Sequence, residues 1–147
     1  MNSFKIKSYA KINLALNVVS RKHSIHKIES IVSFLDLYDE ILIKKIKNKN
    51  HKINFIGKFS NNIKSINTVS KLLKNIDKKK LLNDKFQILI KKNIPSEAGL
   101  GGGSMNAASI LNFLIKKKLI RVKKKEIIEI SNSIGSDVIL GIYSKNL

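Results

Sequence analysis

Residues 6–18, IKSYAKINLALNV, alternate between apolar and polar positions. A period of two predicts a β-strand with one face in the core. The apolar positions of one parity are Ile6, Ala10, Ile12, Leu14, Leu16 and Val18. Lys11 and Asn13 belong to the other parity, so we expect them to project together from the opposite face, about 7 Å apart along the strand.

Other short apolar stretches also predict extended chain. They are residues 28–37, 40–46, 52–57 and 85–92. A helix is also compatible with the length of residues 28–37. Residues 136–143, SDVILGIY, are apolar and β-branched, which predicts a buried strand that the chain enters through Asp137.

Three segments carry helical spacing instead. Residues 67–76 place Val69, Leu72, Leu73 and Ile76 on one side, with Asn67 or Thr68 as the N-cap. Residues 104–117 carry a stripe made of Ala107, Ala108, Leu111, Leu114 and Ile115. Residues 124–134 predict a second amphipathic helix, which Gly135 can end in a left-handed conformation. Strands and helices mix without strict βαβ alternation, so we expect an α+β fold.

Composition sets the class of protein. The chain has 147 residues, of which 43% are hydrophobic, so we expect one domain with a real core. It contains no cysteine, which fits a reducing cytoplasm. The start, MNSFKIKSYAK, lacks the apolar segment of a secretory signal, and no apolar run approaches the roughly 18 residues of a membrane span. We therefore expect a cytoplasmic protein with no membrane partner.

The formal net charge of +19 raises the question of a nucleic-acid partner. Lysine supplies 27 of the 29 basic residues, aromatic residues make up only 6%, and the lysine runs are scattered over several segments. A phosphate-binding surface usually carries arginine and interleaved aromatic side chains. We therefore interpret the charge as a bias of composition, and expect no dedicated nucleic-acid partner.

Four of the seven glycines lie between Gly99 and Gly103, and the one proline, Pro95, is close before them. We call residues 94–103 the glycine loop. It lies between a predicted strand and a predicted helix that starts near Ser104. Glycines allow backbone N–H groups to converge on one point, and a helix N-terminus adds free donors, so the arrangement favours phosphate binding. Ser104 can cap the helix or contact a phosphate oxygen. No GK[ST] follows and the spacing is not G-x-G-x-x-G, which excludes two common nucleotide motifs.

The stretch PSEAGLGGGSMNAA resembles the ATP loop of the GHMP small-molecule kinases. Within that superfamily, one stretch is similar to the N-terminal signature of the 4-diphosphocytidyl-2-C-methyl-D-erythritol kinases: SYAKINLALNVVSRKHSIHKIESIVSFLDLYDEI. That signature consists of an A-K-I/L-N-L strand, a substrate segment around a histidine, and the element I/L-D-x-x-D. INTVSKLL and IGSDVILG resemble that family's nucleoside and catalytic segments. The matches occur in the family's order and cover nearly the whole chain.

The resemblance implies a role for each matching residue. It implies Asp137 as general base with Lys11 as its cationic partner, and Asn13 and His26 as substrate-binding residues. It assigns ATP to Pro95, Gly99, Leu100, Gly101, Gly102, Gly103, Ser104 and Asn67. Mg²⁺ would arrive with the nucleotide, and no resident metal site is implied. The substrate would be a cytidyl diphosphate sugar alcohol, phosphorylated in non-mevalonate isoprenoid synthesis. The usual aromatic before the histidine is Ile25 here, and the usual proline after Val138 is Ile139.

The implied fold is the GHMP kinase N-terminal domain over residues 1–147, a mixed sheet with helices packed on one side. Members of the family carry a second domain after the catalytic aspartate. We expect that C-terminal domain to be absent from this chain, and the chain to be inactive alone. Three alternatives remain. One is another GHMP kinase, for homoserine or mevalonate, and one is a basic RNA-binding domain, because the fold resembles a domain of a small-subunit ribosomal protein. The third is an inactive remnant that folds poorly.

Overall fold

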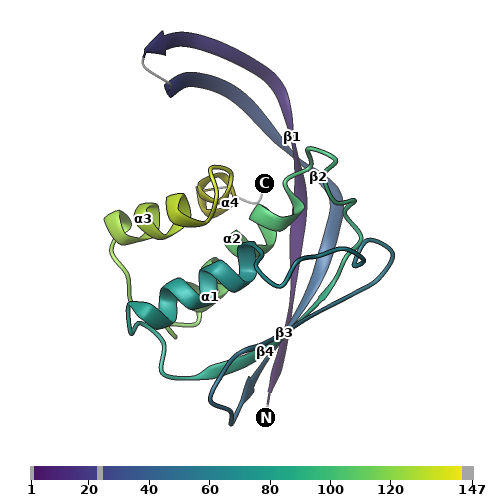
Figure 1. Cartoon of the computed structure of the whole chain (residues 1–147), viewed down its shortest axis with the longest axis vertical. Coiled ribbons are helices and arrows are strands. Elements are labelled where there is room, and N and C mark those ends of the chain that lie inside the picture. The colour runs from purple at the N-terminus through teal and green to yellow at the C-terminus, as the bar shows by residue number, and fades with distance from the viewer. Residues whose placement is uncertain (1, 23–24, 144–147) are drawn as a thin grey trace.

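The computed structural model describes residues 2–22 and 25–143, and the side chains of residues 16 and 18–29 lie outside that description. The elements follow in the order β1 (Ser3–Lys22), β2 (Ile25–Ile46), β3 (Lys52–Ile56), α1 (Thr68–Lys78), β4 (Lys85–Lys91), α2 (Gly102–Lys116), α3 (Lys124–Ile134) and α4 (Val138–Tyr143). The strands form one sheet in the order β1-β2-β4-β3, in which β3 and β4 are parallel and the other pairs antiparallel. The helices lie on one side of it (Figure 1), so the expected α+β fold is confirmed.

The core lies between the sheet and helices α1 and α2. From the sheet, Ile41, Ile43, Ile88 and Ile90 are at most 1% exposed. The helices add Val69, Leu72, Leu73 and Ile76 from α1 and Ile110, Leu111 and Leu114 from α2. The apolar stripe that spacing predicts for α1 is therefore the buried face of that helix.

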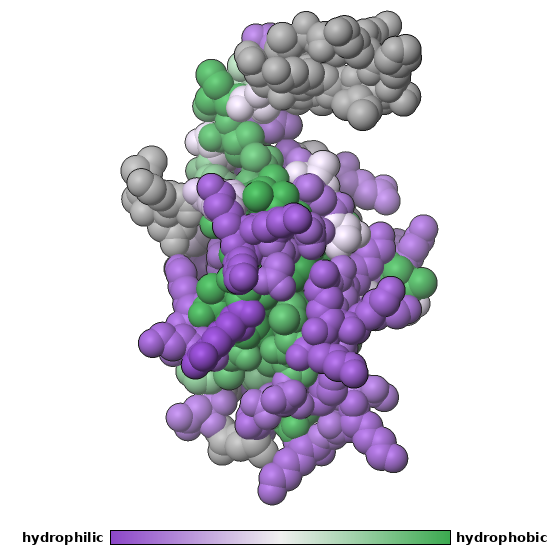
Figure 2. Space-filling model, turned by 90° about the vertical axis from the view of Figure 1, so that its left-hand side faces the viewer, coloured by the Kyte–Doolittle hydropathy of each residue, from purple (hydrophilic) through white to green (hydrophobic). Residues whose placement is uncertain are grey.

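Strands β1 and β2 form a hairpin that is longer than the rest of the sheet. Of strand β2, only residues 40–46 pair with β4. The part of the hairpin near its turn therefore has no further described strand beside it and projects past the helices (Figure 1). On this projecting part Leu14 and Ile31 are 62% and 64% exposed. Figure 2 shows apolar surface on the hairpin and a mostly hydrophilic surface over the helices.

Irregular pairing in the hairpin changes which side chains of β1 are buried. The register shifts between Tyr9 and Lys11, between Asn13 and Ala15, and between Val18 and Ser20. A bulge shifts the alternation by one residue, and Ala10 and Lys11 are both buried as a result. The expectation that Lys11 faces away from the core is therefore wrong. The expectation that Leu14 lies in the core is also wrong, because the hairpin has left the body of the domain at that point.

The ends of α1 and α3 test two sequence predictions. Asn67 is the N-cap of α1, and its Oδ1 accepts hydrogen bonds from the N–H groups of Val69 (3.1 Å) and Ser70 (3.0 Å), as expected. Gly135 ends α3 with φ 176°, which is extended, so the predicted left-handed cap is wrong. The chain turns at once into the next helix, and Val138 N donates to Gly135 O at 3.2 Å.

Residues 138–143 form helix α4, so the predicted strand over residues 136–143 is wrong. Periodicity cannot separate a short apolar strand from a short buried helix. Packing on α2 decides here, because a Cβ at Gly141 would lie 2.6 Å from Ala108 Cβ, a distance that only glycine allows. Asn112 on α2 also donates to Gly141 O at 3.1 Å. Within the described part of the chain, no helix is long and apolar enough to cross a membrane.

His51 connects the start of β3 to β4 and α1. Its Nδ1 accepts the N–H of Phe86 at 3.0 Å, so Nε2 carries the proton and donates to Asp77 Oδ1 at 3.3 Å. Burial lowers the pKa of His51 below its usual range, although Asp77 opposes this effect. Burial alone would raise the pKa of Asp77, but hydrogen bonds from Lys85 and His51 outweigh it and lower that pKa.

We expect the free energy of unfolding to fall when the pH drops below about 6.5, the usual pKa of histidine in an unfolded chain. In that range the unfolded chain binds a proton that the folded chain does not, so the contribution of His51 is complete above the range and is lost as pH falls through the folded pKa. The contribution of Asp77 is lost in a separate window, below about pH 4.

In His51→Asn the new side chain still offers an acceptor for the N–H of Phe86 but does not titrate. The variant should therefore not show the loss of stability that begins below about pH 6.5. Urea unfolding of both proteins at about pH 7.5 and about pH 5.5 measures the difference. An equal loss of stability in the variant would show that another group causes the step.

Candidate functional site

The glycine loop follows an unusual backbone path between β4 and α2. Glu97, Gly99 and Gly101 have φ values of 60°, 71° and 67°, the left-handed region. Gly101 is the N-cap of α2, and no described side chain caps that helix. The first N–H groups of a helix have no intrahelical partner and attract an anion. This end of α2 therefore has the properties of a phosphate site.

Helix α2 begins at Gly102, so Gly102, Gly103 and Ser104 form its first turn. Of the two roles left open for Ser104, capping the helix is excluded, because the chain reaches helical geometry inside the glycine run, and a contact with phosphate stays a prediction. A Cβ at Gly135 would lie 3.5 Å from Ser104 Oγ. The hydroxyl of Ser104 therefore stands close to the turn that leads to Asp137.

The side chain of Lys11 lies against the glycine loop. Its backbone N–H donates to Leu100 O at 3.0 Å. A Cβ at Gly101 would come within 2.9 Å of both Cγ and Cε of Lys11. The stem of the lysine thus fills the space that a side chain at residue 101 would need.

The buried ammonium group of Lys11 reaches the catalytic candidate Asp137. Lys11 Nζ lies 2.9 Å from Asp137 Oδ2, and the two side chains are 5% and 36% exposed. Asn13 Oδ1 lies 3.5 Å from the same Nζ and accepts the hydroxyl of Ser30 at 3.2 Å. The structure therefore brings together three residues that the resemblance singles out. A carboxylate that reaches solvent beside a buried cation can orient an alcohol and accept its proton.

Helix α1 also contacts the glycine loop. Thr68 Oγ1 donates to Gly103 O at 2.6 Å. Asn67, a nucleoside-binding candidate, uses its Oδ1 in the cap and its Nδ2 in a 3.0 Å hydrogen bond to Lys64 O. The contact between Thr68 and the loop had no signal in the sequence, since it joins residues 35 positions apart.

Three further residues that the resemblance singles out are Pro95, Leu100 and His26. Pro95 and Leu100 are half-buried near the two ends of the glycine loop. His26 pairs with Arg21 across the hairpin, and its side chain lies outside the described part of the structure. Its predicted contact with the substrate therefore stays a prediction.

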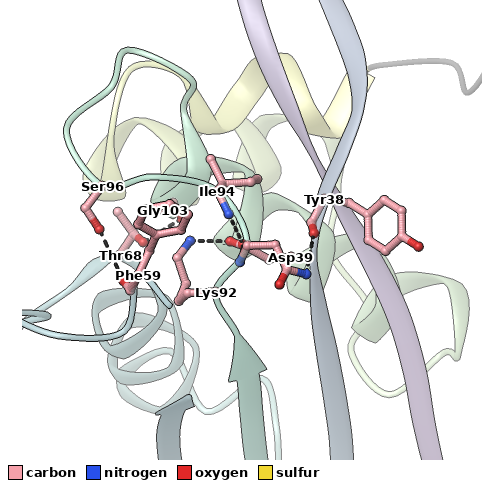
Figure 3. A network of polar contacts seen from close by, with 9 residues as sticks. Tyr38, Asp39, Phe59, Thr68, Lys92, Ile94, Ser96 and Gly103 are labelled. Atoms are coloured by element: carbon pink, nitrogen blue, oxygen red, sulfur yellow. Dashed lines mark hydrogen bonds and ion pairs between the residues drawn. The ribbon is translucent and has the colours of Figure 1, made fainter. Parts of the chain in front are cut away.

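A buried ion pair that the sequence did not reveal lies below the loop. Lys92 Nζ donates to Asp39 Oδ2, and these side chains are 5% and 0% exposed. Asp39 Oδ1 also accepts the N–H groups of Asn93 (2.7 Å) and Ile94 (2.9 Å). Figure 3 shows the side-chain nitrogen of Lys92 and the backbone nitrogen of Ile94 directed at the carboxylate of Asp39, where the chain enters the loop. Asp39 ends the I/L-D-x-x-D element, but nothing in the sequence connected it to one lysine among 27.

Comparison with known proteins gives matches over nearly the whole chain. The family model described as GHMP kinases N terminal domain matches residues 67–145. A Pelagibacter ubique (strain HTCC1062) protein named 4-diphosphocytidyl-2-C-methyl-D-erythritol kinase is 66% identical over 143 residues, which are 97% of this chain and 51% of the relative. A protein of the same name from Francisella tularensis subsp. novicida (strain U112) is 36% identical over 144 residues, 97% of this chain and 52% of the relative. The chain thus spans about half the length of the curated relatives it matches.

Solved structures give the same fold. A crystal structure of 4-(cytidine 5'-diphospho)-2C-methyl-D-erythritol kinase matches with a TM-score of 0.71 and 23% identity, over 95% of this chain and 48% of that one. Homoserine kinase from Cytophaga hutchinsonii matches with a TM-score of 0.60 and 18% identity, over 89% of this chain and 40% of that one. At these identities the likeness establishes the fold alone, and it is the fold that the glycine loop and the A-K-I-N-L strand predict.

Proposed function

Because the chain belongs to the GHMP kinase family through its N-terminal domain, we propose that it is the ATP-binding half of a kinase that phosphorylates 4-diphosphocytidyl-2-C-methyl-D-erythritol. The names of the relatives support this substrate. One observation in the structure carries the proposal: the 2.9 Å contact between Lys11 Nζ and Asp137 Oδ2, below a helix N-terminus suited to phosphate.

In this proposal the glycine loop holds the phosphates of ATP. The residues involved are Pro95, Gly99, Leu100, Gly101, Gly102, Gly103 and Ser104, with Asn67 near the nucleoside. The fit is supported by the positive φ values of Gly99 and Gly101 and by the uncapped first turn of α2. Mg²⁺ would arrive with the nucleotide and neutralise charge on the bound phosphates, and the Ser104 hydroxyl beside them is an oxygen group that suits it.

The chain's own residues would then serve phosphoryl transfer as follows. Asp137 accepts the proton of the substrate's 2-hydroxyl group while that oxygen bonds to the γ-phosphorus and the bond to the leaving ADP breaks. Lys11 offsets the negative charge on the phosphoryl oxygens. Asn13 and His26 would bind the substrate on the hairpin side.

The proposal includes a second domain, equivalent to the other half of the relatives, that completes the cleft for the alcohol. Positioning and charge stabilisation supply most of the catalysis in phosphoryl transfer, so half a cleft should bind nucleotide weakly and transfer no phosphate. ATP as the phosphate donor makes the cytoplasm the expected compartment.

When Mg²⁺-ATP is added to the 15N-labelled chain, we expect the backbone amide NMR signals of the glycine loop to shift at lower ATP concentrations than any other signals. The signals of Gly99, Gly101 and Gly103 should move together and saturate, while those around His51 stay in place. Shifts that spread over the lysine-rich surfaces and vanish with added salt would instead indicate unspecific attraction of the charges, and would contradict the proposed site.

A further inference from the structure

The backbone at the start of the glycine loop is held by Asp39 of β2. One carboxylate oxygen accepts two successive N–H groups, from Asn93 and Ile94. Asn93 Nδ2 in turn donates to Tyr38 O at 3.0 Å. The chain is thus tied to β2 on two sides immediately before Pro95, where the loop turns away from the sheet.

The other carboxylate oxygen of Asp39 holds the ammonium group of Lys92. A Cβ at Gly102 would lie 3.2 Å from Lys92 Nζ and 3.1 Å from Ile94 Cγ2. The first residue of α2 therefore rests directly on the lysine and on the segment that Asp39 holds. A side chain at Gly102 would disturb this packing as well as any phosphate above it.

Burial makes the two charges depend on one another. Asp39 is 0% exposed and the Lys92 side chain 5%. Removing one partner of such a pair leaves an uncompensated charge that draws water into the interior or forces the backbone to move. The parts that would move are residues 92–94 and the first turn of α2.

We propose that Asp39 and Lys92 are positioning residues that hold the glycine loop and the first turn of α2 in the shape that binds nucleotide phosphates. They act through the backbone of the loop and do not touch the nucleotide, since the ammonium group of Lys92 already binds Asp39. This inference rests on the proposed function for its ligand, but the order of the loop can be measured without any nucleotide.

The test compares Asp39→Asn, Lys92→Met and the double variant. In Asp39→Asn the side-chain carbonyl still accepts the N–H groups of residues 93 and 94, but its amide group meets the ammonium of Lys92, donor against donor. Lys92→Met leaves the carboxylate buried without its cation. The double variant removes both charges and keeps the acceptor for the backbone.

Two controls separate positioning from general stability. Asp84→Asn makes the same chemical change in a partly exposed ion pair, in which Asp84 Oδ1 lies 2.7 Å from Lys45 Nζ. Leu72→Ala lowers stability through the core and leaves the contact between Thr68, one turn earlier on α1, and the loop in place. All proteins are compared at a temperature at which circular dichroism shows them fully folded.

Two quantities are measured: amide hydrogen exchange of Gly101, Gly102 and Gly103 without nucleotide, and the affinity for Mg²⁺-ATP. Each single variant should show faster exchange at these amides and about tenfold weaker binding, and the double variant should recover to within about threefold of the unchanged chain. Asp84→Asn and Leu72→Ala should change neither quantity.

Several results would overturn the inference. One is exchange in the single variants no faster than in Leu72→Ala. Another is weak binding in the double variant despite an ordered loop, which would mean that Lys92 contacts the nucleotide directly. If the unchanged chain binds no ATP, the proposed function fails, and the exchange of the loop amides alone decides whether Asp39 and Lys92 position the loop. If a single variant does not fold, the double variant still tests both quantities.

Discussion

Replacing Asp137 with Asn is expected to lower the turnover of a complete enzyme by roughly 10²–10⁴-fold while ATP still binds. Asparagine has nearly the same shape and can still lie beside Lys11, but it cannot accept the proton of the alcohol. The end of α2 that we propose to bind phosphate is untouched by the change. The loss should therefore appear in kcat, with little change in the KM for ATP.

The complete enzyme can be built from this chain and a close relative. The Pelagibacter ubique protein is 66% identical over the shared half, so its remaining half can be joined to the C-terminus of this chain. Turnover is followed as ADP release that depends on 4-diphosphocytidyl-2-C-methyl-D-erythritol. Asp84→Asn, a change of the same kind at a partly exposed ion pair, is the matched control and should retain full turnover.

The 147-residue chain without the added half should show no measurable transfer. Turnover that survives in the Asp137→Asn enzyme would refute Asp137 as the base. Robust turnover by the isolated chain would refute the need for a second domain. Lys11→Met provides a further check, because it removes the cation 2.9 Å from Asp137 and should lower kcat as well.

The sequence predicts the helices and strands correctly where the spacing of nearby residues determines them. The apolar stripe of α1 and its cap depend on residues within a few positions of each other; the stripe was predicted correctly, and Asn67 was one of the two cap candidates. Alternation also identified β1, yet it gave the wrong face for Lys11 and Leu14. Bulges in the hairpin depend on the partner strand, and the sequence of β1 alone does not contain that information.

The error at residues 136–143 has a similar cause. Six apolar residues can form a strand or a helix, and the contact between Gly141 and Ala108 decides between them. The prediction for Gly135 is wrong as well, since its φ of 176° is extended and the chain turns into α4 within three residues. The strand prediction failed because packing between α2 and α4 outweighs local preference.

In the candidate site, too, the sequence reveals features made of neighbouring residues and misses those that join distant ones. The glycine loop stands out in the sequence because its residues are contiguous, and the resemblance to GHMP kinases added Lys11 and Asp137. The structure shows these parts in contact, while their catalytic roles stay predictions. The pair of Asp39 and Lys92 was missed because it joins residues 53 positions apart in a chain rich in lysine. Surface lysines are common, so a single buried one gives no signal of its own.

Gly99 and Gly101 offer a matched pair of substitutions that tests why the loop needs glycine. Their φ values are 71° and 67°, so alanine at either position should pay about the same backbone cost, roughly 1–2 kcal/mol. Their surroundings differ. A Cβ at Gly99 has nothing within 4 Å, whereas a Cβ at Gly101 would lie 2.9 Å from Cγ and Cε of Lys11.

We therefore expect Gly101→Ala to lower the free energy of unfolding by about 1–3 kcal/mol more than Gly99→Ala does, because the buried lysine must move to make room. The movement would pull Lys11 Nζ away from Asp137, so Gly101→Ala should also lower the turnover of the complete enzyme, and Gly99→Ala should leave the pair in place. Urea unfolding of both variants gives the difference in stability, and the joined enzyme gives the turnover. Equal losses at the two positions would mean that backbone strain alone explains the glycines, and that Lys11 is not held in place by the loop.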